Sequence, residues 1–123
     1  FATPEDRAWL EGMLWPQVGA RIAAWREEQL LRTPPPTALV VEVPLLFEAG
    51  MEGAFDATIA VVADEDVRSE RASERGHEAV DERVARQLPQ EEKARRAGHA
   101  VRNDASIDDL QRNLSTILGM LRA

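Results

Sequence analysis

The sequence has 123 residues, of which 44% are hydrophobic, and this is enough apolar material for one domain or part of one. Its net charge of −7 argues against nonspecific binding to nucleic acid or to a membrane surface. It has no cysteine, which excludes a disulfide framework, a thiol nucleophile and a Cys-ligated metal site. The first residues, Phe1 to Asp6, are not typical of a signal peptide and include no initiator Met. We therefore expect a cytoplasmic chain taken from the middle of a protein.

The first third of the sequence predicts two helices. Thr3 suits an N-cap and Pro4 suits the first helical position. Pro16 is expected to end the first helix, because a residue before proline is biased away from helical geometry. A second helix is expected over residues 17–31. The apolar positions of both helices, taken as core candidates, are Trp9, Leu10, Met13, Leu14, Val18, Ile22, Trp25 and Leu30.

Three short apolar runs predict buried strands, at residues 38–43, 58–62 and 99–102. Pro44 cannot donate a hydrogen bond to a sheet, so it marks the end of the first strand. Helical segments separate the three runs, and strands that alternate with helices indicate a parallel α/β sheet. The predicted fold class is therefore α/β.

Further helices are predicted between and after these strands. Asp64 is expected to cap a helix that ends near Gly76, another is expected over residues 77–88, and Pro89 begins a third that ends at Ala97. Ser106 caps the last helix, whose apolar stripe is Leu110, Leu114, Ile117, Leu118 and Leu121.

Positive charge is concentrated in one part of the sequence. The segment from Arg68 to Arg102 has a net charge of +2, and the remaining residues have a net charge of −9. Arg68, Arg71 and Arg75 lie at i, i+3 and i+7, so on a helix they share one face. Such a face can bind a phosphorylated small molecule through its guanidinium groups, or it can be an ordinary solvated helix face.

Other polar residues leave two interpretations open. Glu42, near the end of a buried run, and Glu48 are either solvent-facing acids or carboxylates near bound magnesium. His77 and His99 have no second ligand at metal spacing, so we expect both to be structural and predict no metal site. The sequence contains no G-x-x-x-x-G-K-[ST] motif, and its single lysine is Lys93.

Five segments resemble one family in the correct order. Residues 10–18 resemble "LE-x-I-x-H-P-x-V", and residues 43–48 resemble "IPLLFE". Residues 59–75 resemble a strand followed by the "R-x-x-x-R" lid helix. Residues 80–93 resemble "A-x-x-R-I-x-x-Q-x-x-x-x-x-K", through Val80, Arg83, Val84, Gln87 and Lys93, and residues 101–106 resemble "V-I-x-N-x-G-S". The family is that of the dephospho-coenzyme A kinases, which belong to the P-loop kinases.

This resemblance implies an enzyme that phosphorylates the ribose 3′-hydroxyl of dephospho-CoA with ATP and Mg²⁺, the last step of coenzyme A synthesis. It divides the chain into a helical CoA-binding region (1–37), core strands (38–66), lid helices (67–97), and a core strand with the C-terminal helix (98–123). The resemblance assigns phosphate stabilisation to the lid arginines Arg71 and Arg75. The implied nucleotide-binding residues are Arg71, Arg75, Asn103 and Ser106. The implied substrate-binding residues are Pro44, Leu45, Leu46, Phe47 and Glu48.

The chain departs from the family pattern in two ways. Trp15 replaces the usual His before Pro16. The N-terminal segment of the family, which carries the P-loop strand, is missing, so the strands at 38–43 and 58–62 are expected to have unpaired inner edges. The chain alone is therefore expected to be inactive. Two alternatives stay open: another nucleoside or nucleotide kinase of the P-loop fold, or a non-enzymatic interaction remnant.

Overall fold

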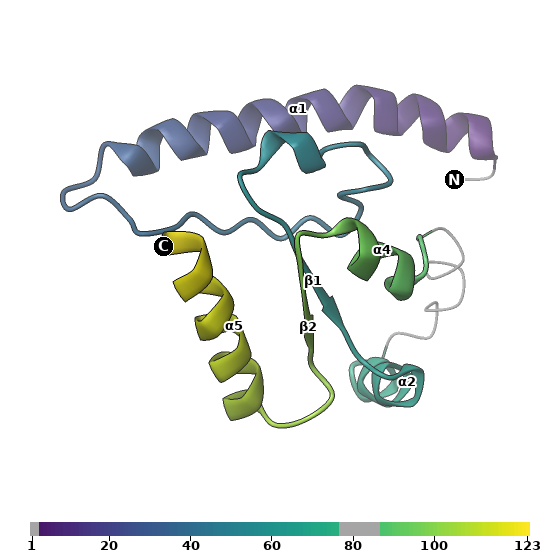
Figure 1. The fold of residues 1–123 in the computed structure, drawn as a ribbon. Helices are drawn as coiled ribbons and strands as arrows, with labels where there is room; N and C mark the ends of the chain where they lie inside the picture. The colour runs from purple at the N-terminus through teal and green to yellow at the C-terminus, as the bar shows by residue number, and fades with distance from the viewer. Residues whose placement is uncertain (1–2, 77–86) are drawn as a thin grey trace. The chain divides into compact units, whose positions relative to one another are not determined.

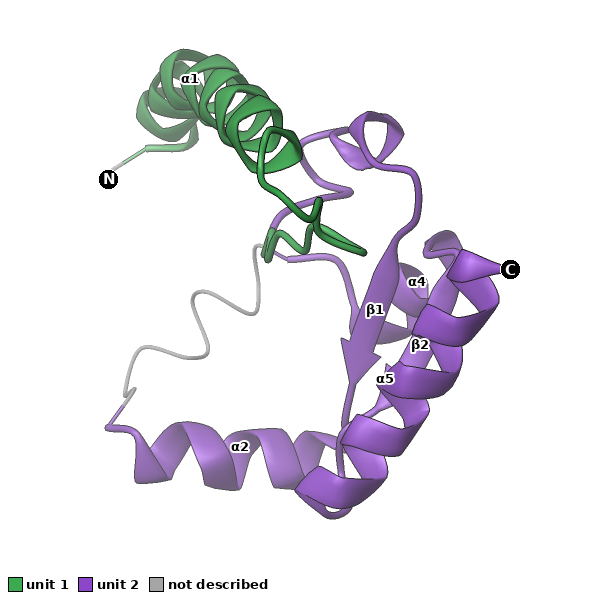
Figure 2. Cartoon of the chain, turned by 90° about the vertical axis from the view of Figure 1, so that its left-hand side faces the viewer, with its two compact units in different colours: residues 1–44 green, residues 45–123 purple. Residues whose placement is uncertain are grey.

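The structure is a computed structural model that describes residues 3–76 and 87–123. The chain divides into two compact units, Phe1–Pro44 and Leu45–Ala123, and each is described by itself (Figure 2). Elements are labelled as in Figure 1. The helix predicted over residues 77–88 lies largely outside the described residues, as do the lid-pattern residues Val80, Arg83 and Val84, and His77.

The first unit contains one long helix, α1 (Pro4–Leu30), rather than two. The Thr3 side chain accepts a hydrogen bond from the Asp6 amide at 3.1 Å, which confirms the predicted N-cap. The predicted break at Pro16 is wrong, because this proline lies inside the helix. Pro16 cannot donate to the Gly12 carbonyl, and the helix continues without that bond; Gln17 Nε2 donates to the neighbouring Met13 carbonyl at 3.2 Å. The helix formers that follow Pro16, mainly alanine, arginine and glutamate, favour its continuation.

The apolar positions of α1 do not form the predicted core. None of the residues of this helix is buried, and Trp9 is 68% exposed. Met13, Leu14 and Leu30 are also exposed. Helical periodicity shows that these residues share a face, but it does not show that another element covers that face.

The strand predicted over residues 38–43 is absent. This segment has no regular secondary structure, and Val40 is 80% exposed. A strand needs a neighbour to pair its backbone groups, and an apolar run cannot supply that neighbour by itself.

The second unit is built on a two-stranded parallel sheet, which confirms the α/β fold class. The strands are β1 (Ile59–Val62) and β2 (His99–Arg102), with Ile59 opposite His99 and Val62 opposite Arg102. The Asn103 amide extends the ladder by donating to the Val62 carbonyl at 2.7 Å. Two of the three predicted strands are therefore correct in position and direction.

Helices before, between and after the two strands are the other regular elements of the second unit (Figure 1). A short 3₁₀ turn, η1 (Glu52–Ala54), precedes β1, and α2 (Glu65–Glu74) follows it. The helix α4 (Gln90–Arg96) contacts both strands, and α5 (Ile107–Arg122) contacts β2. The buried apolar residues of the described chain are Ala60, Ala63, Val101 and Ile117.

Helix boundaries in the second unit follow the sequence closely. Gly76 has φ +72° just after α2, as its predicted place at the helix end requires. Pro89 is the N-cap of α4, and Ser106 caps α5. Of the apolar stripe of α5, Ile117 is buried, whereas Leu118 and Leu121 are exposed. No helix within the described ranges is both long enough and apolar enough to cross a membrane.

Replacing Ser106 by alanine should lower the stability of the second unit. The Ser106 hydroxyl accepts from the Asp109 amide at 3.1 Å and donates to the Asp109 carboxylate at 2.8 Å. Loss of an N-cap costs about 1 kcal/mol in the free energy of unfolding, which urea denaturation followed by circular dichroism would measure. The control is Ser115→Ala at an exposed position of the same helix, which should cause no loss. Equal destabilisation by both substitutions would show that the cap contributes nothing.

Candidate functional site

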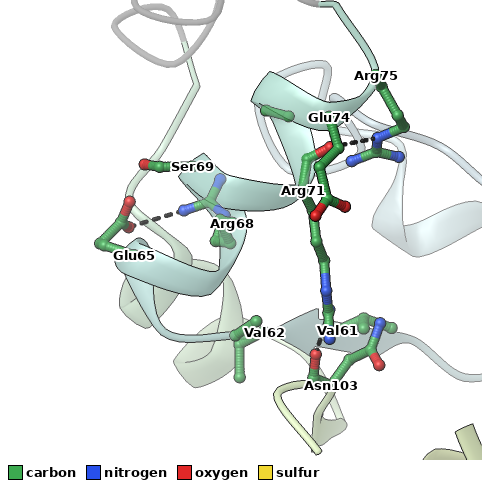
Figure 3. A pocket seen from close by; sticks show the side chains of 11 residues that line it. Val61, Val62, Glu65, Arg68, Ser69, Arg71, Glu74, Arg75 and Asn103 are labelled. Carbon is green, nitrogen blue, oxygen red and sulfur yellow. Dashed lines mark hydrogen bonds and ion pairs between the residues drawn. The ribbon is translucent and has the colours of Figure 1, made fainter. Parts of the chain in front are cut away.

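A groove of about 600 Å³ lies along α2, at the point where β1 ends (Figure 3). Its lining includes the carboxyl end of β1, two arginines and two glutamates of α2, the C-cap residue Arg75, and Asn103 just after β2. In open parallel α/β sheets, ligands bind beyond the carboxyl ends of the strands. The groove is therefore the candidate functional site of the second unit.

Arg71 joins α2 to the end of the sheet. Its side chain extends from the helix towards the strand ends, and Nη1 donates to the Asn103 carbonyl at 2.5 Å (Figure 3). Arg71 is half-buried. A guanidinium has five N–H donors, so this contact orients the group and leaves other donors for a ligand. The structure thus brings together two residues that the sequence assigned to nucleotide binding.

The other two arginines of the face are held differently. Arg75 Nε donates to the Arg71 carbonyl at 3.1 Å, in the last turn of α2. Arg68 Nη1 forms an ion pair with Glu65 Oε1 at 2.8 Å. The sequence spacing makes the three arginines look equivalent, but a carboxylate within the same helix partly neutralises Arg68. Arg71 and Arg75 are consequently better suited than Arg68 to bind an anion.

An ion-pair cluster ties the two strand ends together beside the groove. Arg102, the last residue of β2, donates from Nη2 to Asp64 and to Asp104, both at 2.6 Å. The hydrogen bond from Arg102 lowers the pKa of the Asp104 carboxyl, and the same contact raises the pKa of Arg102. Asp64 occupies the predicted N-cap position of α2, but its carboxylate pairs with Arg102 and makes no capping bond. Sequence reasoning missed this cluster. The closeness of Arg102 to Asp104 in the chain was its only local signal.

The proposed substrate-binding segment forms a compact turn. The Ala49 amide donates to the Leu45 carbonyl and the Met51 amide to the Leu46 carbonyl, each at 2.9 Å. Gly50 has φ +65°, a left-handed conformation that glycine adopts without strain. Leu45, Leu46 and Phe47 are half-buried and do not line the groove, and Pro44 ends the first unit.

Glu48 holds this turn against α4. Its Oε2 forms an ion pair with Lys93 Nζ at 3.1 Å, and the Leu88 amide approaches the same oxygen at 3.4 Å. The two charged side chains are 15% and 19% exposed. The structure therefore gives Glu48 a positioning contact, and its role in substrate binding stays a prediction.

The remaining candidates are not among the residues that line the groove. The Ser106 hydroxyl is used to cap α5, Glu42 is exposed in the irregular segment before Pro44, and His99 begins β2. Among the residues that the structure describes, no three potential ligands of the His, Asp or Glu type gather to hold a metal ion.

The parallel sheet and the groove beside it define an α/β protein with an arginine-lined groove, and grouped guanidiniums of this kind can bind phosphate. A model of the dephospho-CoA kinase family matches residues 1–109. The chain belongs to the dephospho-CoA kinase family.

Individual relatives agree with this placement. A dephospho-CoA kinase of Thermosynechococcus vestitus is 34% identical, and one of Thermus thermophilus is 36% identical, each over 98% of this chain. The crystal structure of TT1252 from Thermus thermophilus is similar, with a TM-score of 0.78 and 34% identity. It matches 100% of this chain and 63% of its own length. The chain spans 59% of the length of each of the two kinases.

Replacing Glu48 by alanine should destabilise the second unit strongly. The substitution removes the carboxylate that pairs with the half-buried Lys93 ammonium at 3.1 Å, and the loss of a hydrogen bond between charged groups costs about 2 kcal/mol. Urea denaturation would measure this loss, with Glu52→Ala at an exposed position as the control, expected within about 0.5 kcal/mol of the native chain. A loss no larger than that of the control would contradict a stabilising role for the pair.

The Arg102 cluster should make stability depend on acid pH. Because the pKa of Asp104 is lowered in the folded chain, the cluster stabilises the fold above the unfolded carboxyl pKa, about 3.9. That contribution is lost as the pH falls through the lowered value. Arg102→Met should therefore reduce the free energy of unfolding at pH 6, and the difference from the native chain should shrink at pH 2.5. Arg122→Met at the exposed end of α5 is the control. A difference that stays constant with pH would contradict the assignment.

Proposed function

We propose that this chain supplies the phosphate-binding arginines of a dephospho-CoA kinase, which transfers the γ-phosphoryl group of ATP to the ribose 3′-hydroxyl of dephospho-CoA. The supporting observation is the half-buried Arg71, which lines a groove at the carboxyl ends of two parallel strands and is oriented by the Asn103 carbonyl. Family membership supports this reaction, and the arginine-lined groove supports a role for these residues in it.

The chemistry of phosphoryl transfer suits such a groove. A bond forms between the 3′-oxygen and the γ-phosphorus while the bond to ADP breaks, and the hydroxyl proton is released. The transition state is loose and spreads negative charge over the transferring oxygens, so positioning and charge neutralisation account for most of the catalysis. Guanidinium groups of Arg71 and Arg75 would neutralise part of that charge. Asn103 would fix the position of Arg71, and its side chain would lie beside the nucleotide.

The rest of the catalytic machinery is not in this sequence. The 123 residues contain no P-loop motif, whose backbone amides and lysine would bind the β- and γ-phosphates. Mg²⁺ usually takes one or two carboxylates together with phosphate oxygens. The carboxylate of Glu65 in the groove already pairs with Arg68, and among the described residues no three possible ligands of the His, Asp or Glu type gather around a metal position. Because the P-loop motif is not part of these residues, we expect the chain alone to be inactive.

Other parts of the chain would bind the two substrates. Residues 1–37 would belong to the CoA-binding region, residues 67–97 to the lid, and the turn from Pro44 to Glu48 would contact dephospho-CoA. Ser106 would lie near the nucleotide at the start of α5. Both substrates are small soluble molecules, and a cytoplasmic location fits their use.

Arg71→Ala in a full-length enzyme containing this chain should lower kcat by at least about tenfold, or about 1.4 kcal/mol in activation free energy. The loss should appear mainly in kcat, because charge that develops during transfer is bound more tightly than charge in the ground state. Steady-state kinetics with ATP and dephospho-CoA would measure both constants.

Arg68→Ala is the matched control, since Arg68 lies on the same helix face but is paired with Glu65. It should change kcat by no more than about threefold, near 0.65 kcal/mol. Equal effects of the two substitutions, or no effect of Arg71→Ala in a folded enzyme, would show that this helix face is an ordinary solvated surface with no role in catalysis.

A further inference from the structure

A side-chain amide completes the end of β1. Gln90, the first residue of α4, accepts a hydrogen bond at Oε1 from the Ala63 amide at 3.1 Å. Its Nε2 donates to the carbonyl of the same alanine at 2.6 Å. One carboxamide therefore pairs with both backbone groups of one residue, as a neighbouring strand would do. The two residues are 27 positions apart in the sequence.

The backbone at Ala63 needs such a partner. Ala63 follows the last residue of β1 directly and is only 7% exposed. Buried amide and carbonyl groups cost free energy when they lack hydrogen bonds. The Asn103 amide continues the ladder as far as the Val62 carbonyl, to which it donates. Gln90 thus supplies the hydrogen-bond partners of Ala63, the residue that follows the last strand-to-strand pair.

The same carboxamide reaches the first turn of α2. Gln90 Nε2 lies 3.4 Å from Glu65 Oε1, and that oxygen also accepts from Arg68. The helix begins at Glu65, two residues after Ala63, so its starting direction is set where Gln90 binds. Six residues further on, in the second turn of the helix, Arg71 donates to the Asn103 carbonyl. The placement of the groove arginines therefore depends on a fixed backbone at Ala63 and Glu65.

We propose that Gln90 is a positioning residue for the arginine groove. It fixes the strand-to-helix junction at Ala63, and the fixed junction places Arg71 at the strand ends. The role in phosphate binding rests on the proposed function, whereas the effect on Arg71 does not. Gln90 does not line the groove, so it acts through the junction.

The test uses the 123-residue chain with three substitutions. Gln90→Leu keeps the size of the side chain and removes both hydrogen bonds to Ala63. Gln90→Glu keeps the acceptor for the Ala63 amide and loses the donor to the Ala63 carbonyl. Gln111→Leu at an exposed position of α5 is the matched control. For each variant we would measure hydrogen exchange of the Ala63 amide, the NMR signal of Arg71 Nε–H, and the Kd for inorganic tripolyphosphate. Circular dichroism would fix a temperature at which every variant is folded.

Gln90→Leu should speed exchange at Ala63 at least tenfold, shift the Arg71 signal, and weaken tripolyphosphate binding at least threefold. Gln90→Glu should keep Ala63 protected, yet it should also shift Arg71 and weaken binding, because the carbonyl loses its partner and a carboxylate approaches Glu65. Gln111→Leu should change none of the three. This pattern separates positioning from general stability, since it is measured in folded chains.

Three results would overturn the proposal. Unchanged exchange at Ala63 in Gln90→Leu would show that the amide does not pair with the junction. Faster exchange with an unchanged Arg71 signal would show a purely structural role, and so would unchanged tripolyphosphate affinity. If the native chain binds no tripolyphosphate, the proposed function of the groove fails, and the Arg71 signal alone decides the positioning role: a shift in Gln90→Leu supports it and no shift refutes it.

Discussion

The fold of the second unit depends on side-chain contacts at the carboxyl ends of its two short parallel strands. Each strand has four residues, and a two-stranded sheet of this length is marginal without further contacts. Side chains supply those contacts at one end of the sheet. Gln90 completes the backbone at Ala63, and Arg102 joins the acids that follow the two strands. Because the groove begins at the same end, we propose that the contacts at this end of the sheet also position the arginines.

One face of α4 connects the end of the sheet with another part of the second unit. Gln90 and Lys93 are three residues apart on α4, so they share a face. The first binds the end of β1, and the second binds Glu48 in the turn assigned to the acceptor substrate. If the proposed function is correct, α4 positions the parts of the chain that meet each substrate, although none of its residues lines the groove.

The sequence predicted what local chemistry determines. The strands at residues 59–62 and 99–102, the Ser106 cap and the left-handed Gly76 all follow from short patterns. The prediction of a strand at residues 38–43 was wrong, because strand formation needs a neighbouring strand to pair with, and an apolar run does not specify one. The spacing of Arg68, Arg71 and Arg75 predicted a shared face, but it could not distinguish an arginine paired with Glu65 from one that reaches Asn103. The contacts of Glu48 with Lys93 and of Gln90 with Ala63 join distant residues, and no local pattern indicates them.

NMR titration of the chain would test whether the groove beside α2 binds the phosphates of ATP. Backbone and arginine side-chain signals would be followed during addition of ATP and, separately, of adenosine. We expect ATP to shift the signals of Arg71, Arg75 and Asn103. Adenosine has no phosphate, so it should leave the arginine guanidinium signals unchanged. Shifts that avoid the groove, or equal arginine shifts with adenosine, would contradict phosphate binding in the groove.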